Sequence, residues 1–216
     1  MKEKCKNIKP IPCKVILVGD SGVGKTTIID RYLNKYKENV SSTLSTSYYV
    51  KTEIINDYKI DFQIWDTVGQ EQYRSLNSLF FKDAHICLMV FDITRDESFD
   101  SIKNYWYDAI QQNGLEGTII GIAGNKNDLY AYEKVDRKEV RSFSDEIKSV
   151  FKFTSAKQNF CIKELFTELG KRFVSSKFMK EFGPEYFYDV NNRAKSFQLN
   201  AQQKDINKNK NKKRCC

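Results

Sequence analysis

The sequence of 216 residues contains one histidine, His85, and its six cysteines show no paired C-x-x-C spacing. His85 lies at the start of the apolar run Ala84–Phe91, so we expect a packed or hydrogen-bonded side chain. Cys13 and Cys87 lie in apolar, strand-like runs, where a free thiol behaves as a small apolar group. Histidine catalysis, a zinc site and a disulfide framework therefore lack support in the sequence.

Long apolar runs are also missing: none approaches the length of a membrane-spanning helix. The opening Met-Lys-Glu-Lys-Cys is too charged for a secretory signal, so we expect synthesis and residence in the cytosol. The net charge of +8 is uneven, because residues 177–216 hold ten Lys or Arg and four Asp or Glu, a balance of 10 − 4 = +6. The rest of the chain is nearly neutral, which argues against a nucleic-acid partner for the folded domain.

Strand-like and helical patterns alternate along the chain. Buried or half-buried strands are expected at 13–18, 48–55, 59–65, 84–91, 118–123 and 151–154, and helices near 25–33, 72–80, 98–112, 137–150 and 161–173. Asn56-Asp57 signals a hairpin between the second and third strands. This alternation predicts an α/β fold whose mostly parallel sheet is covered by helices on both faces, with ligand sites at the carboxyl ends of the strands.

Three regions divide the chain. Residues 1–12 read as an exposed N-terminal extension, and residues 13–176 as one domain with a large core. Residues 177–216 read as a disordered tail, because the apolar pattern decays from about Gly183 and Asn, Gln and Lys dominate.

Residues 19–26, Gly-Asp-Ser-Gly-Val-Gly-Lys-Thr, match the phosphate-binding pattern G-x-x-x-x-G-K-[ST]. Its glycines allow a tight turn that aims backbone N–H groups inward, and the helix that follows adds its positive N-terminal end. Lys25 would reach the outer phosphates, while the Thr26 hydroxyl suits Mg²⁺. A glycine-rich turn with an incidental lysine would explain the glycines alone, but not the strand before the loop and the helix after it.

The segment Asn125-Lys126-Asn127-Asp128 follows the strand expected at 118–123 and lies at the edge where ligands bind. Guanine presents two adjacent N–H donors, and an ionised Asp128 can accept both, whereas adenine would leave the carboxylate short of partners. Standing alone, this segment would be interpreted as a polar turn.

Four motifs together resemble the small GTPases of the Ras superfamily. They are the phosphate loop, Trp65-Asp66-Thr67-Val68-Gly69-Gln70-Glu71, Asn125-Lys126-Asn127-Asp128 and Thr154-Ser155-Ala156-Lys157. With Leu88–Thr94 and the double-cysteine end, the chain is most similar to the Rab family. Residues Thr43-Leu44 to Tyr48-Tyr49 and Thr154 to Asn159 resemble those of the endocytic Rabs. The resemblance covers residues 11–175 and implies a P-loop NTPase fold, a three-layer sandwich with a six-stranded sheet and one antiparallel edge strand.

The resemblance also implies roles for particular residues. The predicted phosphate ligands are Ser21, Gly22, Val23, Gly24, Lys25, Thr26 and Thr27. Tyr36 would stack on guanine, Asn125, Lys126 and Asp128 would bind it, and Ser155, Ala156 and Lys157 would buttress it. Mg²⁺ would be held by Thr26 and Thr43, with Asp66 in its outer shell. Gly69 would sense the γ-phosphate. Gln70 would orient the attacking water, with Lys25 assisting.

Such a site implies a switch between GTP and GDP. Hydrolysis would depend on positioning and charge, and would stay slow until an activating protein supplies an arginine worth about 10³ to 10⁵ in rate. The γ-phosphate and Mg²⁺ would order residues 34–47 and 68–80, and effectors would read the ordered form. The further partners implied are an exchange factor, a GDP-dissociation inhibitor and a prenylation escort protein.

Several positions depart from the family pattern. Val68 stands where small GTPases nearly always have alanine, which adds bulk beside the γ-phosphate sensor. Ser45 and the pair Tyr48-Tyr49 alter the effector-facing segment, and Gln72-Tyr73 alters a regulator contact. Phe153 stands where glutamate is usual. None of these departures removes a nucleotide ligand.

The chain ends in Cys215-Cys216 behind Lys212-Lys213-Arg214. This end is no C-a-a-X box, and an accidental pair is the simpler interpretation of the two residues alone. In a Rab-like chain it resembles the double prenylation signal. This resemblance implies attachment to the cytoplasmic face of an endosomal or other vesicle membrane, in exchange with the cytosol. Two lipid chains are what stable anchoring needs, and the basic residues add attraction to anionic lipid.

Two other functions remain open at this point. A binding scaffold that holds nucleotide but barely cycles has Val68 in its favour. A kinase of small molecules would need an acceptor site and a lid, for which no segment of the sequence is a candidate.

Overall fold

A computed structural model describes residues 10–37, 47–67 and 80–180. Within them, six strands form one sheet in the order β2-β3-β1-β4-β5-β6. The strands are β1 (Ile11–Val18), β2 (Ser47–Ile55), β3 (Tyr58–Asp66), β4 (Ile86–Asp92), β5 (Ile119–Asn125) and β6 (Val150–Phe153). Strand β2 pairs antiparallel with β3, and the other neighbouring pairs are parallel. The predicted sheet, mostly parallel with one antiparallel edge strand, is confirmed.

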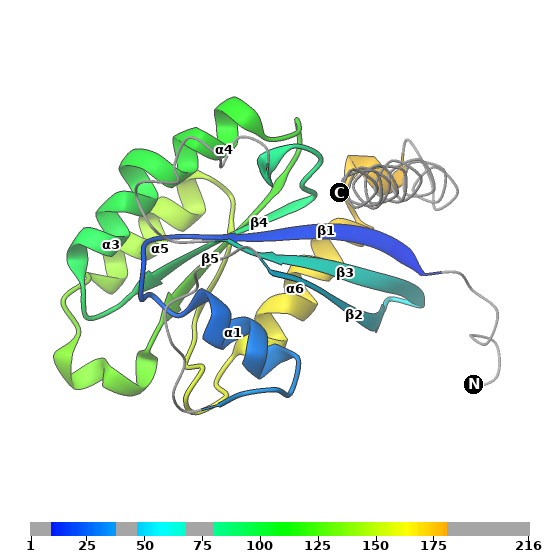
Figure 1. Cartoon of the computed structure of the whole chain (residues 1–216). Coiled ribbons are helices and arrows are strands. Elements are labelled where there is room, and N and C mark those ends of the chain that lie inside the picture. Colours follow the sequence, from blue (N-terminus) through cyan, green and yellow to red (C-terminus); the bar gives the residue numbers. More distant parts are fainter. Residues whose placement is uncertain (1–9, 38–46, 68–79, 181–216) are drawn as a thin grey trace, which may run out of the picture.

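Helices lie on both faces of this sheet (Figure 1). One face carries α1 (Lys25–Tyr32) and α6 (Ile162–Val174), and the other carries α3 (Asp96–Ser101), α4 (Tyr107–Asn113) and α5 (Arg137–Glu146). A π-helical segment, η2 (Ile102–Trp106), joins α3 to α4, and a 3-10 helix, η3 (Asn127–Tyr132), follows β5. The three layers are those of the predicted P-loop NTPase fold.

The sequence of strand β4 is continuously apolar because all seven of its residues are buried. Leu88 and Val90 join the core on the α1 and α6 side, whereas Cys87 and Met89 join the core on the α3 to α5 side. A strand with helices on both faces has no solvent side, so alternation of apolar and polar residues is lost.

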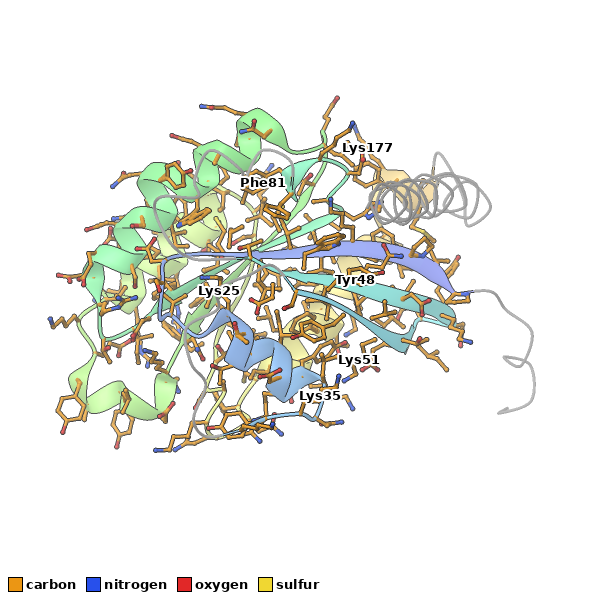
Figure 2. The ribbon with its side chains drawn as sticks, in the orientation of Figure 1. Lys25, Lys35, Tyr48, Lys51, Phe81 and Lys177 are labelled. Atoms are coloured by element: carbon orange, nitrogen blue, oxygen red, sulfur yellow. The ribbon has the colours of Figure 1, made fainter. Side chains whose placement is uncertain are left out.

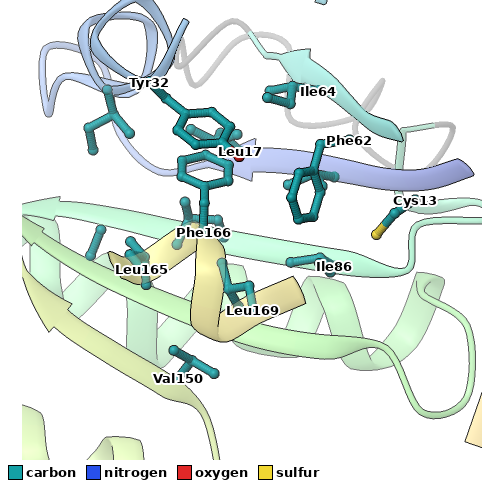
Figure 3. Packing of buried hydrophobic residues seen from close by; sticks show 14 of the residues in the cluster. Cys13, Leu17, Tyr32, Phe62, Ile64, Ile86, Val150, Leu165, Phe166 and Leu169 are labelled. Carbon is teal, nitrogen blue, oxygen red and sulfur yellow. The ribbon is translucent and has the colours of Figure 1, made fainter. Parts of the chain in front are cut away.

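Aromatic rings fill the core between α1 and α6 (Figure 3). The ring of Tyr32 stacks on that of Phe166, with centroids 3.8 Å apart and planes inclined by 5°. Phe62 of β3 meets both rings edge-on, at 6.4 and 6.2 Å. These contacts fix the position of the two helices against the sheet.

The predicted hairpin is present between β2 and β3. Asn56 and Asp57 both have positive φ angles, 48° and 67°. A two-residue turn of this hand matches the twist of the strands, and Asn and Asp tolerate it better than most residues. The turn sequence therefore determines the pairing of this edge strand.

His85 is packed and hydrogen-bonded, which confirms the prediction. Its Nδ1 accepts a hydrogen bond from the Lys14 N–H at 2.9 Å, and its ring meets Phe173 and Phe178 edge-on. Burial, together with a smaller effect of the nearby Lys14 charge, lowers the pKa of His85 to about 4, so the ring is neutral at physiological pH. Cys13 and Cys87 are buried free thiols.

Several element boundaries differ from the sequence-based expectation. Strand β1 begins at Ile11, which is buried, although residues 1–12 were expected to form an exposed extension. The helix expected at 98–112 extends from Asp96 to Asn113 and contains the π-helical segment. The helix expected at 137–150 ends at Glu146, because the chain reverses at Lys148, whose φ is 53°, and Val150 begins β6. Residues 177–180 are helical, and Phe178 and Met179 pack against the core. The domain limits at 12 and 176 stay predictions.

The short helix predicted at 72–80 falls mostly outside the described residues, as do the extension and most of the tail. In the described ranges, no helix has the length and apolar character needed to cross a bilayer.

Candidate functional site

The loop between β1 and α1 lies at the carboxyl end of the parallel strands, beside the base-binding motif (Figure 1). Gly19, Gly22 and Gly24 have φ angles of 139°, 76° and 99°. A Cβ at Gly19 would lie 2.1 Å from the Val90 carbonyl oxygen, and one at Gly24 would lie 2.3 Å from Asn125 Nδ2. Two of the three glycines are thus required by both conformation and close approach.

Lys25 is buried at the start of α1, and Figure 2 shows it beneath the end of β1. Its Nζ donates hydrogen bonds to the carbonyl oxygens of Gly19 at 2.7 Å and Asp20 at 2.9 Å. The pKa of Lys25 is lowered to about 8, mainly by burial and in smaller part by the Arg95 charge, while the charges of Asp66 and Asp20 partly offset the shift. The ammonium therefore sits inside the loop, where an anion would relieve the cost of its burial.

Thr26 and Asp66 meet where α1 faces the end of β3. The Thr26 hydroxyl donates to Asp66 Oδ2 at 2.6 Å. The other carboxylate oxygen, Oδ1, is buried and has no hydrogen-bond partner among the described residues. Burial raises the pKa of Asp66, while the Thr26 hydrogen bond and the Lys25 charge lower it. An unsatisfied buried carboxylate oxygen beside a hydroxyl fits a hard cation such as Mg²⁺.

The described ranges hold no cluster of three or more His, Cys, Asp or Glu side chains that could bind a metal by themselves. Mg²⁺ usually keeps several water and substrate oxygens in its shell, so a site with few protein ligands is compatible with it.

Asn125 joins three of the four motifs. Its Nδ2 donates to the Val23 carbonyl of the phosphate loop at 2.9 Å. Its Oδ1 accepts hydrogen bonds from the Thr154 hydroxyl and the Ala156 N–H, both at 3.3 Å. One buried amide thus fixes the phosphate loop and the segment 154–157 relative to each other.

The remaining base-motif residues are held in place as well. The Ser155 hydroxyl donates to Asp128 Oδ1 at 2.5 Å and accepts from the Gln158 N–H at 3.0 Å. Lys126 has a left-handed backbone, with φ 65°, and its Nζ lies 2.7 Å from Asp92 Oδ2. Burial raises the pKa of Asp92, but hydrogen bonds from Lys126 and Thr94 outweigh this and hold the pKa below its usual value.

Arg31 of α1 is a site residue that the sequence analysis missed. Its Nε and a terminal nitrogen donate to the carbonyl oxygens of Ala156 at 2.7 Å and Lys157 at 2.8 Å. Its guanidinium lies 3.5 Å from the centre of the Tyr36 ring. Arg31 therefore connects the predicted base-stacking aromatic with the buttressing segment, although 125 residues separate Arg31 from Ala156.

Most of the predicted site residues lie at this edge of the sheet, in its adjoining loops and in the first turn of α1. They are residues 21–27, 36, 66, 125, 126, 128 and 155–157. Thr43, Gly69, Gln70, Val68, Cys215 and Cys216 lie outside the described residues. The roles assigned to all these residues stay predictions.

Comparison with known proteins gives a consistent result. Residues 14–175 match the Ras family. The chain is 36% identical to the Ras-related protein Rab-22A of Homo sapiens over 164 residues, which are 76% of this chain and 84% of that protein. It is 36% identical to RABF2a of Arabidopsis thaliana over 165 residues, 76% of this chain and 82% of that protein. It is 35% identical to RabJ of Dictyostelium discoideum over 170 residues, which are 78% of this chain and 66% of that protein.

Proposed function

The chain belongs to the Rab family of small GTPases, and on this premise we propose that it is a GTP-driven switch that hydrolyses GTP slowly and regulates intracellular vesicle trafficking. The observation that carries the proposal is the set of hydrogen bonds made by Asn125. This one side chain joins the phosphate loop to the segment 154–157. The arrangement supports a ligand with phosphate at one end and a base at the other.

Guanine is the base that this arrangement favours. Asp128 would accept the two N–H donors of guanine, and the hydroxyl of Ser155 orients its carboxylate. The Tyr36 ring would cover one face of the base, and the Arg31 guanidinium, which packs on the Tyr36 ring, would hold that ring in place. Ser155, Ala156 and Lys157 would close the other side.

The phosphates would occupy the loop from Ser21 to Thr27, with Lys25 as its buried cation. Mg²⁺ would be held by Thr26 and Thr43, with Asp66 behind it. When bound, the ion neutralises charge on the phosphate oxygens and makes phosphoryl transfer easier. Gln70 would orient the attacking water, and an activating protein would supply the missing arginine.

The edge of the sheet offers a surface on which effectors could read the nucleotide state. Tyr48 of β2, Trp65 of β3 and Phe80 form a row of rings whose centroids are 5.0 and 6.4 Å apart. Tyr48 is 48% exposed, and it adjoins the segments that are predicted to change with the nucleotide. Exposed aromatic side chains of this kind are enriched in protein interfaces. An exchange factor, an activating protein and a GDP-dissociation inhibitor are the regulators that such a cycle requires.

Nucleotide selectivity tests the proposal. Purified full-length chain is expected to bind GTP and GDP and not ATP, and Asp128→Ala is expected to lose the preference for guanine. The matched control is Asp136→Ala, since the Asp136 carboxylate caps α5 by accepting a hydrogen bond from the Lys138 N–H. Equal binding of GTP and ATP by the wild-type chain would refute a guanine switch and would revive the kinase interpretation.

Hydrolysis separates a cycling switch from a scaffold. A single turnover of bound GTP is expected to be slow in the wild-type chain, to need Mg²⁺, and to quicken in Val68→Ala. No hydrolysis in either form, even with activating proteins, would favour the scaffold.

We propose that Cys215 and Cys216 are prenylated after delivery by an escort protein, and that the chain exchanges between the cytosol and an endosomal or other vesicle membrane. Replacing both cysteines with serine and fractionating the cell tests this. Undiminished membrane association of the double variant would contradict it.

A further inference from the structure

Arg95, in the turn between β4 and α3, reaches the phosphate loop although none of the four motifs contains it. Its terminal nitrogen donates a hydrogen bond to the Ser21 carbonyl oxygen at 3.0 Å. Its Nε is buried, makes no hydrogen bond within the described residues, and lies 3.6 Å from Asp92 Oδ2. The side chain thus spans from the end of the central strand to Ser21 of the loop.

Asp92 connects this contact to the base motif. The carboxylate is almost fully buried, with 3% of its side chain exposed. Its Oδ2 faces Arg95 Nε on one side and receives the Lys126 ammonium at 2.7 Å on the other. Its Oδ1 is fixed by the N–H and hydroxyl of Thr94, at 2.9 and 2.8 Å. A rigid anion therefore lies between Arg95, which contacts the phosphate loop, and Lys126 of the base motif.

Two cations, Lys25 and Arg95, serve the same loop. Arg95 is close enough to Lys25 to disfavour the charged form of that ammonium. Two positive groups beside one short loop repel each other in the protein alone, and the attraction of both to a bound polyphosphate would offset this repulsion. The arrangement is therefore suited to a bound phosphate chain.

We propose that Arg95 is a positioning residue of the nucleotide site: it fixes the Ser21 carbonyl and, through Asp92, ties the phosphate loop to Lys126, so that release of the phosphates and release of the base are coupled. This inference rests on the proposed guanine-nucleotide site. The planar guanidinium matters because two different nitrogens face two different acceptors, which a single ammonium cannot reproduce.

Release of fluorescently labelled GDP from the full-length chain tests the inference. Arg95→Ala is expected to speed release about tenfold, the effect of one or two charge-assisted hydrogen bonds at a partly exposed site. Arg95→Lys should recover less than half of this effect. The control is Arg141→Ala, which removes an exposed arginine from α5 and should release GDP at the wild-type rate.

Competition experiments with GMP distinguish an effect of Arg95 on the phosphate loop from a general loss of nucleotide affinity. Arg95→Ala should weaken GDP about tenfold more than it weakens GMP, because GMP lacks the outer phosphate that the loop would hold. Thermal unfolding of the GDP-loaded variants checks that each is folded.

Three results would overturn the inference: wild-type release in Arg95→Ala, full recovery in Arg95→Lys, or equal weakening of GDP and GMP. If the wild-type chain itself binds no guanine nucleotide, the proposed function fails instead. The two failures are therefore distinguishable.

Discussion

Substituting Gly24 with alanine tests how closely the phosphate loop is fitted to the base motif. The added Cβ would lie 2.3 Å from Asn125 Nδ2, an overlap of more than 1 Å for non-bonded heavy atoms. Asn125 would have to move, and its hydrogen bond to the Val23 carbonyl would be lost. Since φ of Gly24 is 99°, the alanine would also be held in a left-handed conformation.

The two effects can be estimated separately. A left-handed backbone costs a residue with a Cβ about 1 to 2 kcal/mol. Losing a buried hydrogen bond and leaving its acceptor unsatisfied costs about 1 to 3 kcal/mol. Together they amount to about 2 to 5 kcal/mol, which corresponds to a loss of GDP affinity between about 30-fold and several thousandfold.

Gly22 provides a matched control in the same loop. Its φ is also positive, 76°, but a Cβ there would have no heavy atom within 4 Å. Gly22→Ala should therefore show the conformational cost alone, and bind GDP about tenfold more tightly than Gly24→Ala. The assay is titration of nucleotide-free protein with fluorescent GDP at fixed Mg²⁺. Equal affinities of the two variants would show that the contact with Asn125 is unimportant for binding.

Two further measurements concern the buried lysine and the core. Because the pKa of Lys25 is about 8 before binding and bound phosphate should raise it, GDP binding should take up a proton above pH 7. The affinity for GDP should then fall about tenfold from pH 7 to 9. Calorimetry in two buffers should measure an uptake of about half a proton per GDP bound at pH 8. An affinity that does not change with pH would contradict this. Phe166→Ala should lower the free energy of unfolding by about 3 to 5 kcal/mol in chemical denaturation, because it empties a stacked, fully buried position. Phe160→Ala, at a position 47% exposed, should change it by less than about 0.5 kcal/mol.

Contiguous sequence signals predicted the features that depend on neighbouring residues. The glycines of the phosphate loop, the Asn56-Asp57 turn and the buried run of β4 each need only a local pattern, and the structure has all three. Helix ends were less predictable, because an apolar periodicity does not record where the backbone reverses. Lys148 reverses the chain with a left-handed conformation that its residue type does not signal.

Contacts between distant segments were the part that sequence reasoning could not supply. Arg31 and Arg95 reach carbonyl oxygens 125 and 74 residues away, and a backbone acceptor leaves no mark on the sequence. The π-helical segment is a further feature that the sequence does not reveal. It ends at Trp106, whose Nε1 donates to Asp20 of the phosphate loop at 3.2 Å, and the added width of the helical turn cannot be inferred from apolar spacing.

The register of the sheet explains why residues so far apart in the chain form one site. Leu17 is paired with Asp66 of β3 and with Leu88 of β4, and Asp92 pairs with Asn125. Strands β4 and β5 therefore end four residues beyond the level of Leu17 and Asp66, and the register fixes how far along the sheet each motif lies. A slip of one residue would move a motif by about 3.3 Å and turn its side chain to the other face of the sheet. Core residues such as Phe166 hold this register at a distance, whereas Gly24 and Arg95 act within the site. Core substitutions should therefore lower stability before affinity, and site substitutions should lower affinity with little change in stability.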